Sequence, residues 1–242
     1  MKVFLSVLMG LVVCVFLSGQ AQAEMVGYWS FDEIDGKIVK DSSGSGNDGT
    51  LMGTAKVVKD GISGSTLSLD GEGYVEVVAH PSLENQEFTI SFWMKTDDCT
   101  AKYNGGISKG LIFGAVANQA YQLPFSKGRG SFGISDQKVG NYKSARAYIG
   151  DNEWHFWTAV VASDSIRLCK DGKLTEKRER KARDKLDPKK FNPLVIDYSK
   201  HRKFYIGGGR LGLKGLIDEV RIYNAALSDI EVAIAYSRVV TH

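Results

Sequence analysis

The chain is poor in proline, cysteine and histidine, with 4, 3 and 4 copies among 242 residues. So little proline excludes a collagen-like or proline-rich chain. The four histidines, His80, His155, His201 and His242, lack the spacing of zinc ligands, and no cysteine pair lies near them. A formal net charge of only +3 argues against nucleic acid as a partner. The remaining composition, with 43% hydrophobic residues and 27 glycines, is typical of a chain that buries a sizeable core.

The longest apolar run lies at the N-terminus, from Phe4 to Leu17, after a basic start. The small-residue sequence Ala21-Gln22-Ala23 follows it, and this order is typical of a secretory signal peptide. We therefore expect residues 1–23 to be a cleaved signal peptide and residues 24–242 to be exported, either secreted or held at the cell surface. Two alternatives, a membrane anchor and a lipoprotein, fit less well. The run is shorter than the roughly 18 to 20 residues of a membrane anchor, and Cys14 lies inside it, unlike the cysteine of a lipoprotein. No other segment could span a bilayer.

Two cysteines, Cys99 and Cys169, belong to the mature chain, which would fold in a compartment that permits disulfides. They form one bridge if the fold brings their sulfur atoms together. The alternative is that Cys169, inside the strand-like sequence Ile166-Arg167-Leu168-Cys169, is a small packed residue. The sequence leaves both alternatives open, because it gives no distance between the two cysteines.

Short apolar runs with a period of two recur between turn signals, which predicts an antiparallel all-β sandwich. In residues 88–94 every second side chain is apolar, as in a strand with one buried side. Asp171-Gly172 predicts a tight hairpin turn. The predicted strands are Val26–Phe31, Thr66–Leu69, Tyr74–Val78, Phe88–Met94, Ser131–Ile134, Ala147–Ile149, Phe156–Val161, Ser165–Cys169, Lys203–Ile206 and Leu216–Tyr223.

One short helix is predicted close to the C-terminus. Ser228 and Glu231 form a capping box ahead of the apolar residues 232–236. We expect this helix to cover an edge of the sandwich. The chain has no internal repeat and no linker rich in proline or serine, so residues 24–242 are expected to form a single domain.

A basic segment spans residues 173–190, with nine basic and four acidic residues and a local net charge of +5. It could dock an acidic polysaccharide, because lysine and arginine bind sulfate and carboxylate groups well. The alternative is a solvated, partly helical excursion whose mixed charges keep it soluble.

Motifs for catalysis are missing or incomplete. Residues 44–49 and 207–212 both match G-x-G-x-x-G, but neither opens a helix after a buried parallel strand, so dinucleotide binding is not expected. His155 is expected to be a hydrogen-bonded structural residue, since no G-x-S-x-G turn or activated cysteine accompanies it. Glu33, Asp35 and Ile38 do not match the E-x-D-x-x-E pattern of sandwich glucanases. We therefore predict a protein that is not an enzyme.

Several stretches together resemble the laminin G-like, concanavalin A-like jelly-roll family of exported bacterial proteins. The resemblance covers about residues 25–237, and its strength lies in the order and spacing of its parts. These parts are Tyr28-Trp29-Ser30-Phe31-Asp32-Glu33, the glycine-rich sequence 41–49, Leu67-Ser68-Leu69-Asp70-Gly71, residues 88–94, Glu153-Trp154-His155-Phe156, residues 168–173, and Gly215-Leu216-Ile217-Asp218-Glu219-Val220-Arg221-Ile222-Tyr223-Asn224 followed by Ala226-Leu227-Ser228. Residues 96–137 and the basic segment depart from the family pattern, which leaves the ligand open.

The resemblance implies a two-sheet jelly roll whose first and last strands are adjacent, so that Asp32 and Asp218 approach one another. It also implies a structural calcium ion, with side-chain ligands at Asp32, Asp41, Asn47 and Asp218 and with backbone carbonyls from the glycine-rich turn. The alternative is that Asp41 and Asn47 only bond their own turn and that Asp218 is a carboxylate at a strand end.

The resemblance further implies a secreted, non-catalytic module that recognises carbohydrate or extracellular matrix, with a polysaccharide or glycoprotein as partner. Sugar binding needs an exposed aromatic ring beside polar groups. The candidate residues are Tyr103, Tyr121, Tyr142 and Tyr148, with Arg146 nearby. The alternative is a structural or adhesion domain that binds a protein or a cell-envelope component without a sugar site. The oligomeric state is left open.

Overall fold

The computed structural model describes residues 22–78, 80–96, 104–110, 119–126, 128–136, 140–148, 150–179, 193, 195–199, 203–208 and 212–240. For residues 104, 105, 110, 119, 126, 135, 136, 140–147 and 240 it describes the backbone alone. The expected signal peptide, apart from residues 22 and 23, lies outside these ranges, as do Cys99 and Tyr103.

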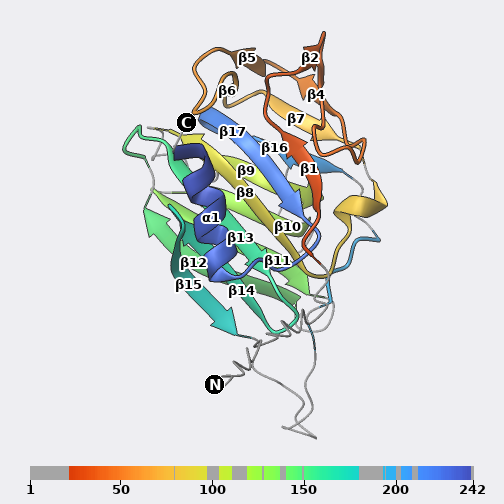
Figure 1. The fold of residues 1–242 in the computed structure, drawn as a ribbon, viewed down its shortest axis with the longest axis vertical. Coiled ribbons are helices and arrows are strands. Elements are labelled where there is room, and N and C mark those ends of the chain that lie inside the picture. The colour runs from red at the N-terminus through yellow and green to blue at the C-terminus, as the bar shows by residue number, and fades with distance from the viewer. Residues whose placement is uncertain are drawn as a thin grey trace, which may run out of the picture.

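The described strands form two antiparallel sheets, which confirms the predicted all-β sandwich (Figure 1). The first, sheet A, has the order β15-β14-β13-β8-β17-β6-β5, and β1 also pairs with β17. The first and last strands are therefore neighbours, as the family resemblance implies. The strands of sheet A are β1 (Met25–Trp29), β5 (Lys56–Val58), β6 (Thr66–Asp70), β8 (Phe88–Lys95), β13 (His155–Val161), β14 (Ser165–Lys170), β15 (Lys173–Glu179) and β17 (Lys214–Tyr223).

The second sheet, sheet B, has the order β12-β11-β10-β9-β16-β7-β4-β3-β2. A short 3₁₀ turn, η1 (Pro81–Leu83), connects β7 of this sheet with β8 of sheet A. The strands of sheet B are β2 (Ile34–Asp35), β3 (Ile38–Val39), β4 (Gly49–Met52), β7 (Tyr74–Val77), β9 (Asn104–Gly110), β10 (Gln119–Ser126), β11 (Arg129–Asp136), β12 (Gly140–Tyr148) and β16 (Phe204–Ile206).

Aromatic pairs join the inner faces of the two sheets. Trp29 of sheet A stacks on Phe204 of sheet B with ring centroids 5.4 Å apart. Phe125 of sheet B lies 6.2 Å from Phe92 and 5.2 Å from Trp157, both in sheet A. All five side chains are buried. Each such side chain stabilises the fold by about 1.5–3 kcal/mol when it leaves water, so these pairs hold the sheets together.

The C-terminal helix, α1 (Asp229–Val240), begins where the capping box predicts. The Ser228 backbone N–H donates to Glu231 Oε2 at 2.7 Å, and the Glu231 N–H donates to Ser228 Oγ at 3.3 Å. The predicted position at a sandwich edge is wrong, because α1 lies across the outer face of sheet A (Figure 1). There Val232 packs with Val160 of β13 and Cys169 of β14, the third and second strands from the β15 edge.

This position of α1 explains why β8 is buried on both faces. The alternation in residues 88–94 predicts one buried side, and Phe88, Ile90, Phe92 and Met94 do lie in the main core. The opposite side of the strand is covered as well, since Trp93 stacks on Tyr236 of α1 with centroids 5.6 Å apart.

Candidate functional site

The outer face of sheet B carries polar and aromatic side chains at its centre. In β7 the valines Val75 and Val77 point into the core, so Tyr74 and Glu76 face outward. In β16 the alternation places Tyr205 outward between two core residues. The local sequence thus builds one apolar and one polar side into each strand.

Register extends this surface across most of the sheet. Seven residues, one from each of seven neighbouring strands, are consecutive cross-strand partners, and we call them the outer row. With strands about 4.8 Å apart, the row is roughly 29 Å long. From β11 to β3 its members are Gly133, Gln122, Ser108, Tyr205, Glu76, Thr50 and Ile38.

An aromatic pair lies at the middle of the outer row. Tyr74 meets Tyr205 edge to face, with ring centroids 5.8 Å apart and an interplanar angle of 73°. Tyr205 is only 7% exposed and is therefore the buried support of the pair, whereas Tyr74 is half-buried. Burial raises the pKa of Tyr205, and the nearby Glu76 carboxylate raises it further. The Tyr205 phenol is therefore a neutral hydrogen-bonding group at neutral pH.

One ion pair borders the same spot. Lys203 Nζ donates to Glu76 Oε1 at 2.7 Å, and this hydrogen bond raises the pKa of the lysine. Of the seven residues of the outer row, Glu76 alone carries a carboxylate, and the same register continues past Ile38 to Asp35 of β2.

The tyrosines expected to bind sugar contribute no described side chain to this site. Tyr121 is 1% exposed and packs on Phe88 at 4.7 Å, which removes it from the candidates. Tyr148 is 64% exposed at the end of β12. Tyr142 and Arg146 lie on β12, where only the backbone is described, and Tyr103 is outside the described residues.

Tyr74 and Tyr205 are not among the tyrosines predicted to bind sugar. A signal for both was present. In Tyr74-Val75-Glu76-Val77 and Phe204-Tyr205-Ile206, each tyrosine occupies the phase opposite to the apolar core residues. The alternation of inward and outward side chains along each strand therefore predicts that both rings lie on the outer face.

The four expected calcium ligands fall into two pairs. Asp32 and Asp218 both bond the turn at residues 61–65. The Ser65 N–H donates to Asp32 Oδ1 at 2.7 Å, and the Ile62 N–H donates to Asp218 Oδ2 at 3.0 Å. The adjacency of β1 and β17 thus brings both aspartates to one turn, as expected.

Asp41 and Asn47 form the second pair, within the glycine-rich turn. The Asp41 carboxylate accepts from the backbone N–H groups of Tyr28, Ser43 and Asn47 at 2.8–2.9 Å. The Asn47 side-chain amide donates to the Val26 carbonyl at 2.7 Å, while its buried Oδ1 has no partner within the described part of the chain. The bonds of Asp41 to Ser43 and Asn47 lie within the turn, but its bond to Tyr28 and the Asn47 bond to Val26 reach β1. The unpartnered Asn47 Oδ1 keeps one ligand atom available among the described residues.

Asp218 is the most perturbed carboxylate of this region. Its side chain is fully buried, and burial raises its pKa to about 8 even though three backbone N–H groups donate to it. The neighbouring Glu219 carboxylate raises that pKa further. A buried carboxylate of this kind becomes stable as an anion when a cation lies beside it.

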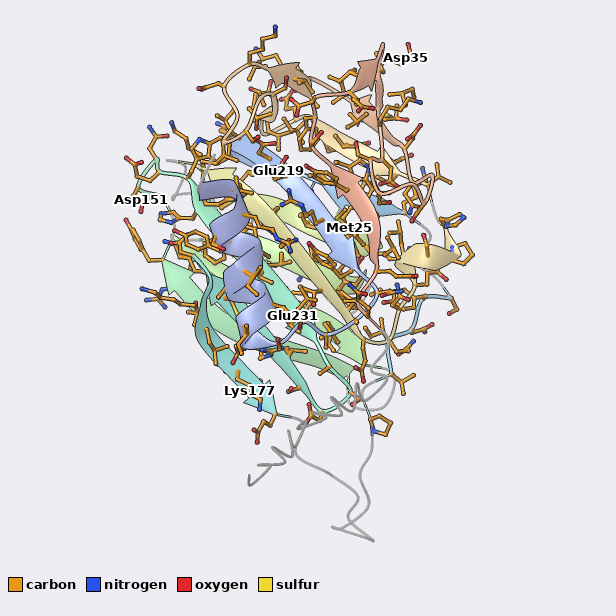
Figure 2. All side chains as sticks on the ribbon, viewed as in Figure 1. Met25, Asp35, Asp151, Lys177, Glu219 and Glu231 are labelled. Carbon is orange, nitrogen blue, oxygen red and sulfur yellow. The ribbon has the colours of Figure 1, made fainter. Side chains whose placement is uncertain are left out.

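Glu219 has a left-handed backbone, with φ +54°, at an irregularity in the pairing of β17 with β8. This conformation is uncommon outside glycine and costs on the order of 1–3 kcal/mol. It turns the Glu219 side chain to Tyr28 of β1, whose hydroxyl donates to Oε1 at 2.9 Å, and to Arg221, which forms an ion pair with it. Figure 2 shows Glu219 on the strand beside the one that begins at Met25.

Backbone oxygens complete the surroundings of the Asp32–Asp218 pair. A Cβ on Gly61 would meet Asp218 Oδ2 at 2.6 Å and the carbonyls of Ser65 and Gly64 at 2.8 and 2.9 Å. A Cβ on Gly64 would meet Asp32 Oδ1 at 2.4 Å. The turn therefore gathers hard oxygen atoms of the kind that calcium prefers. Among the described residues, no group of three or more histidine, cysteine, aspartate or glutamate side chains could hold a metal, so an ion here would rely on these carbonyls.

His155 is held between two carboxylates, in agreement with its expected structural role. Its Nδ1 lies 2.8 Å from Asp171 Oδ2, and its Nε2 lies 2.9 Å from Asp151 Oδ2. Asp171 also begins the predicted hairpin turn between β14 and β15, with φ values of +52° at Asp171 and +71° at Gly172.

The described part of the basic segment, residues 173–179, is an exposed strand, β15, and not a helical excursion. Its remainder lies outside the described residues.

The thiol of Cys169 is buried beneath α1, and burial raises its pKa to about 11. Because Cys99 is not described, the disulfide stays a prediction. Within the described ranges, no helix is both long and apolar enough to cross a membrane.

The chain belongs to the concanavalin A-like lectin/glucanase superfamily, whose family model matches residues 69–233. No curated protein matches the chain at a significant level. Solved structures resemble the fold at sequence identities below 20%, which shows the fold alone.

One such structure is domain 4 of AbnA, a GH43 extracellular arabinanase from Geobacillus stearothermophilus, in complex with arabinotriose. It is 19% identical with a TM-score of 0.65, over 88% of this chain and 98% of that chain. Another is the binding domain of Paraclostridial Mosquitocidal Protein 1, at 16% identity and a TM-score of 0.67 over 89% of this chain and 52% of that one. A third is the binding domain of botulinum neurotoxin DC in complex with rat synaptotagmin II, at 13% identity and a TM-score of 0.66, again over 89% and 52%.

The chain thus spans about half the length of the toxin domains it matches. The structural neighbours are mostly carbohydrate-binding or receptor-binding domains, and one is part of a glycoside hydrolase.

Proposed function

We propose that the protein is an exported, non-catalytic carbohydrate-binding module and that the outer row is its sugar-binding surface. The observation that carries this proposal is the unbroken register of the row across seven strands, with the Tyr74–Tyr205 pair at its middle. The fold shared with an arabinotriose-bound domain supports it.

The surface supplies both kinds of contact that a sugar needs. The half-buried Tyr74 ring offers an apolar face for stacking, and the buried Tyr205 fixes its orientation. The half-buried Gln122 and Thr50 supply donors and acceptors for hydroxyl groups on either side. Glu76 and Lys203 neutralise each other, so this surface favours neutral sugars.

The direct test is binding of the purified protein to an array of neutral and acidic glycans, in calcium and again in EDTA, with folding verified by circular dichroism. Reproducible binding of a neutral glycan supports the proposal. Silence across the array, from folded protein, contradicts it.

Recognition of a protein is the second candidate, favoured by one observation. Ile230 and Ile234, one turn apart on α1, are 73% and 45% exposed, and Leu174 of β15 is 46% exposed. Silence on the glycan array combined with loss of partner binding in an Ile230→Ser variant would favour this alternative.

The proposal includes a structural calcium ion at the Asp32–Asp218 pair. The two carboxylates and the carbonyls of Gly64 and Ser65 would hold it. The ion would supply the nearby positive charge that keeps the buried Asp218 carboxylate ionised. Without a cation, the buried Asp218 is favoured in its protonated form, and its hydrogen bonds to the 61–65 turn weaken.

A further inference from the structure

The edge strands of the two sheets meet on one side of the sandwich. β12 is the last strand of sheet B and β15 the last strand of sheet A, and the two lie side by side (Figure 1). Four residues surround the end of β12 at this place, and we call them the edge cluster. They are Arg129, Tyr148, Lys170 and Lys173.

Tyr148 is the centre of the edge cluster. It is the last residue of β12, and its side chain is 64% exposed. Arg129 of β11 is its direct cross-strand partner, so both side chains lie on the same face of sheet B. Lys170 Nζ reaches Tyr148 from sheet A and donates to its backbone carbonyl at 2.9 Å. Tyr148 thus presents an exposed ring at a strand end, with Arg129 in cross-strand register and the Lys170 ammonium at its backbone carbonyl.

The pairing of Lys170 with Lys173 is electrostatically unfavourable. The two lysines are direct cross-strand partners on either side of the Asp171–Gly172 turn. Like charges in this position destabilise a hairpin. The Asp171 carboxylate does not bond either lysine, because it accepts from the Phe156 N–H and contacts His155. The other acidic side chain that holds His155, Asp151, is likewise engaged there.

The cations farther along β15 differ from those of the edge cluster. Lys177 pairs with Glu179 at 3.0 Å and Arg178 pairs with Glu176 at 2.9 Å, so each has a carboxylate within its own strand. Within the described ranges, neither Arg129 nor Lys173 has such a partner. In the described parts of β11, β14 and β15, the basic side chains without a carboxylate partner are therefore Arg129, Lys170 and Lys173.

We infer that the edge cluster is a second binding site, separate from the outer row, for the acidic sugars of a polyanionic glycan. The Tyr148 ring stacks on a sugar ring, while the guanidinium and ammonium groups bind its carboxylate or sulfate. A bound anion also relieves the repulsion between Lys170 and Lys173. The formal net charge of +3 and the small size of the cluster favour an acidic sugar over nucleic acid, which requires a broad basic surface.

The test is calorimetric titration of the purified protein with polygalacturonate, heparin, a neutral arabinan and a DNA duplex, at two salt concentrations. The test variant is Arg129→Ser/Lys173→Ser, and the matched control is Lys177→Ser, which removes an exposed but paired lysine from the same strand (Figure 2). We expect the double variant to lose at least about tenfold in affinity for an acidic glycan, since each substitution removes a hydrogen bond from a charged donor to the anion. Lys177→Ser should change that affinity less than about twofold.

Three outcomes would overturn the inference: no binding of either acidic glycan, equal losses in the double variant and the control, or equal binding of a DNA duplex with the same residue dependence. The arabinan arm separates this inference from the proposed function. Arabinan binding that is unchanged by the double variant leaves the outer row in place whatever happens at the edge cluster.

Discussion

Asp32 and Asp218 come from opposite ends of the chain, yet their carboxylates accept hydrogen bonds from a single turn, at Ser65 and Ile62 respectively. The turn has room for both only because residues 61 and 64 are glycines, whose absent Cβ atoms would lie 2.6 and 2.4 Å from carboxylate oxygens. The pairing of β1 with β17 fixes this approach. The two aspartates therefore join the two ends of the chain through hydrogen bonds to the same turn.

Calcium should raise the thermal stability of the protein through this pair. We expect the melting temperature to be higher in millimolar calcium than in EDTA, because an ion that binds only the folded state stabilises it by mass action. In Asp218→Asn, which keeps the shape but removes the charge, the calcium effect should disappear. Asp48→Asn is the matched control, since Asp48 is an exposed aspartate that pairs with Lys40. A melting temperature that EDTA leaves unchanged in the wild type would count against the ion.

Lys109 should lower stability in a pH-dependent manner. Its side chain is fully buried, its ammonium has no hydrogen-bond partner in the described part of the chain, and Glu84 lies 3.5 Å away. Burial lowers the pKa of Lys109, and Glu84 opposes that change only in part. Between the lowered folded pKa and the unfolded value of about 10.4, the unfolded chain binds more protons. The contribution of Lys109 to the free energy of unfolding therefore increases as the pH rises from its lowered folded pKa to its unfolded pKa.

Replacing the buried charge tests this directly. Lys109→Met should stabilise the protein by about 1 kcal/mol at neutral pH and remove this part of the pH dependence. Glu84→Gln should destabilise it by about 3 kcal/mol, because the ammonium then stays buried without a countercharge. Urea unfolding of the three proteins from pH 7 to 10 measures both effects. A Lys109→Met variant less stable than the wild type at pH 7 would refute the argument.

The hydroxyl of Tyr28 should stabilise the strained bulge at Glu219. It donates to the buried Glu219 carboxylate at 2.9 Å, and burial together with that carboxylate raises the pKa of Tyr28 to about 12. Tyr28→Phe should therefore cost about 1.5 kcal/mol of unfolding free energy.

Tyr223→Phe is the matched control for this variant. Tyr223 lies on β17 and is half-buried, but its hydroxyl makes no hydrogen bond to any described residue. Its unfolding free energy should change by less than about 0.5 kcal/mol. Equal losses in the two variants, measured by denaturant unfolding, would show that the Glu219 bond contributes nothing specific.

Much of the fold could be predicted from local patterns. Alternation identified β8 and β13, the Asp171-Gly172 pair identified the β14–β15 turn, and the capping box identified α1. β9, with the sequence Asn104-Gly105-Gly106-Ile107-Ser108-Lys109-Gly110, was missed. Three glycines and few apolar residues give it little strand propensity, and pairing with β10 and β16 forms it.

The site was harder to predict, because it depends on register between strands that are distant in sequence. Tyr74 and Tyr205 meet only because Tyr205 pairs with Glu76, and nothing local to either segment specifies that partner. The approach of Asp32 to Asp218 was expected from the family resemblance. The burial of Lys109 could not be read from a sequence in which lysines are usually exposed.

The central claim is tested most directly by comparing Tyr74→Ala with Tyr148→Ala in calorimetric titration with the neutral glycan that binds most tightly on the array. Loss of the stacking ring removes about 1.5–3 kcal/mol, so Tyr74→Ala should weaken binding by roughly 10- to 100-fold. Tyr148→Ala, an equally drastic change at the edge of the sandwich, should leave that affinity unchanged. A folded Tyr74→Ala protein that binds the glycan as tightly as the wild type would contradict the assignment of the outer row as the sugar-binding surface.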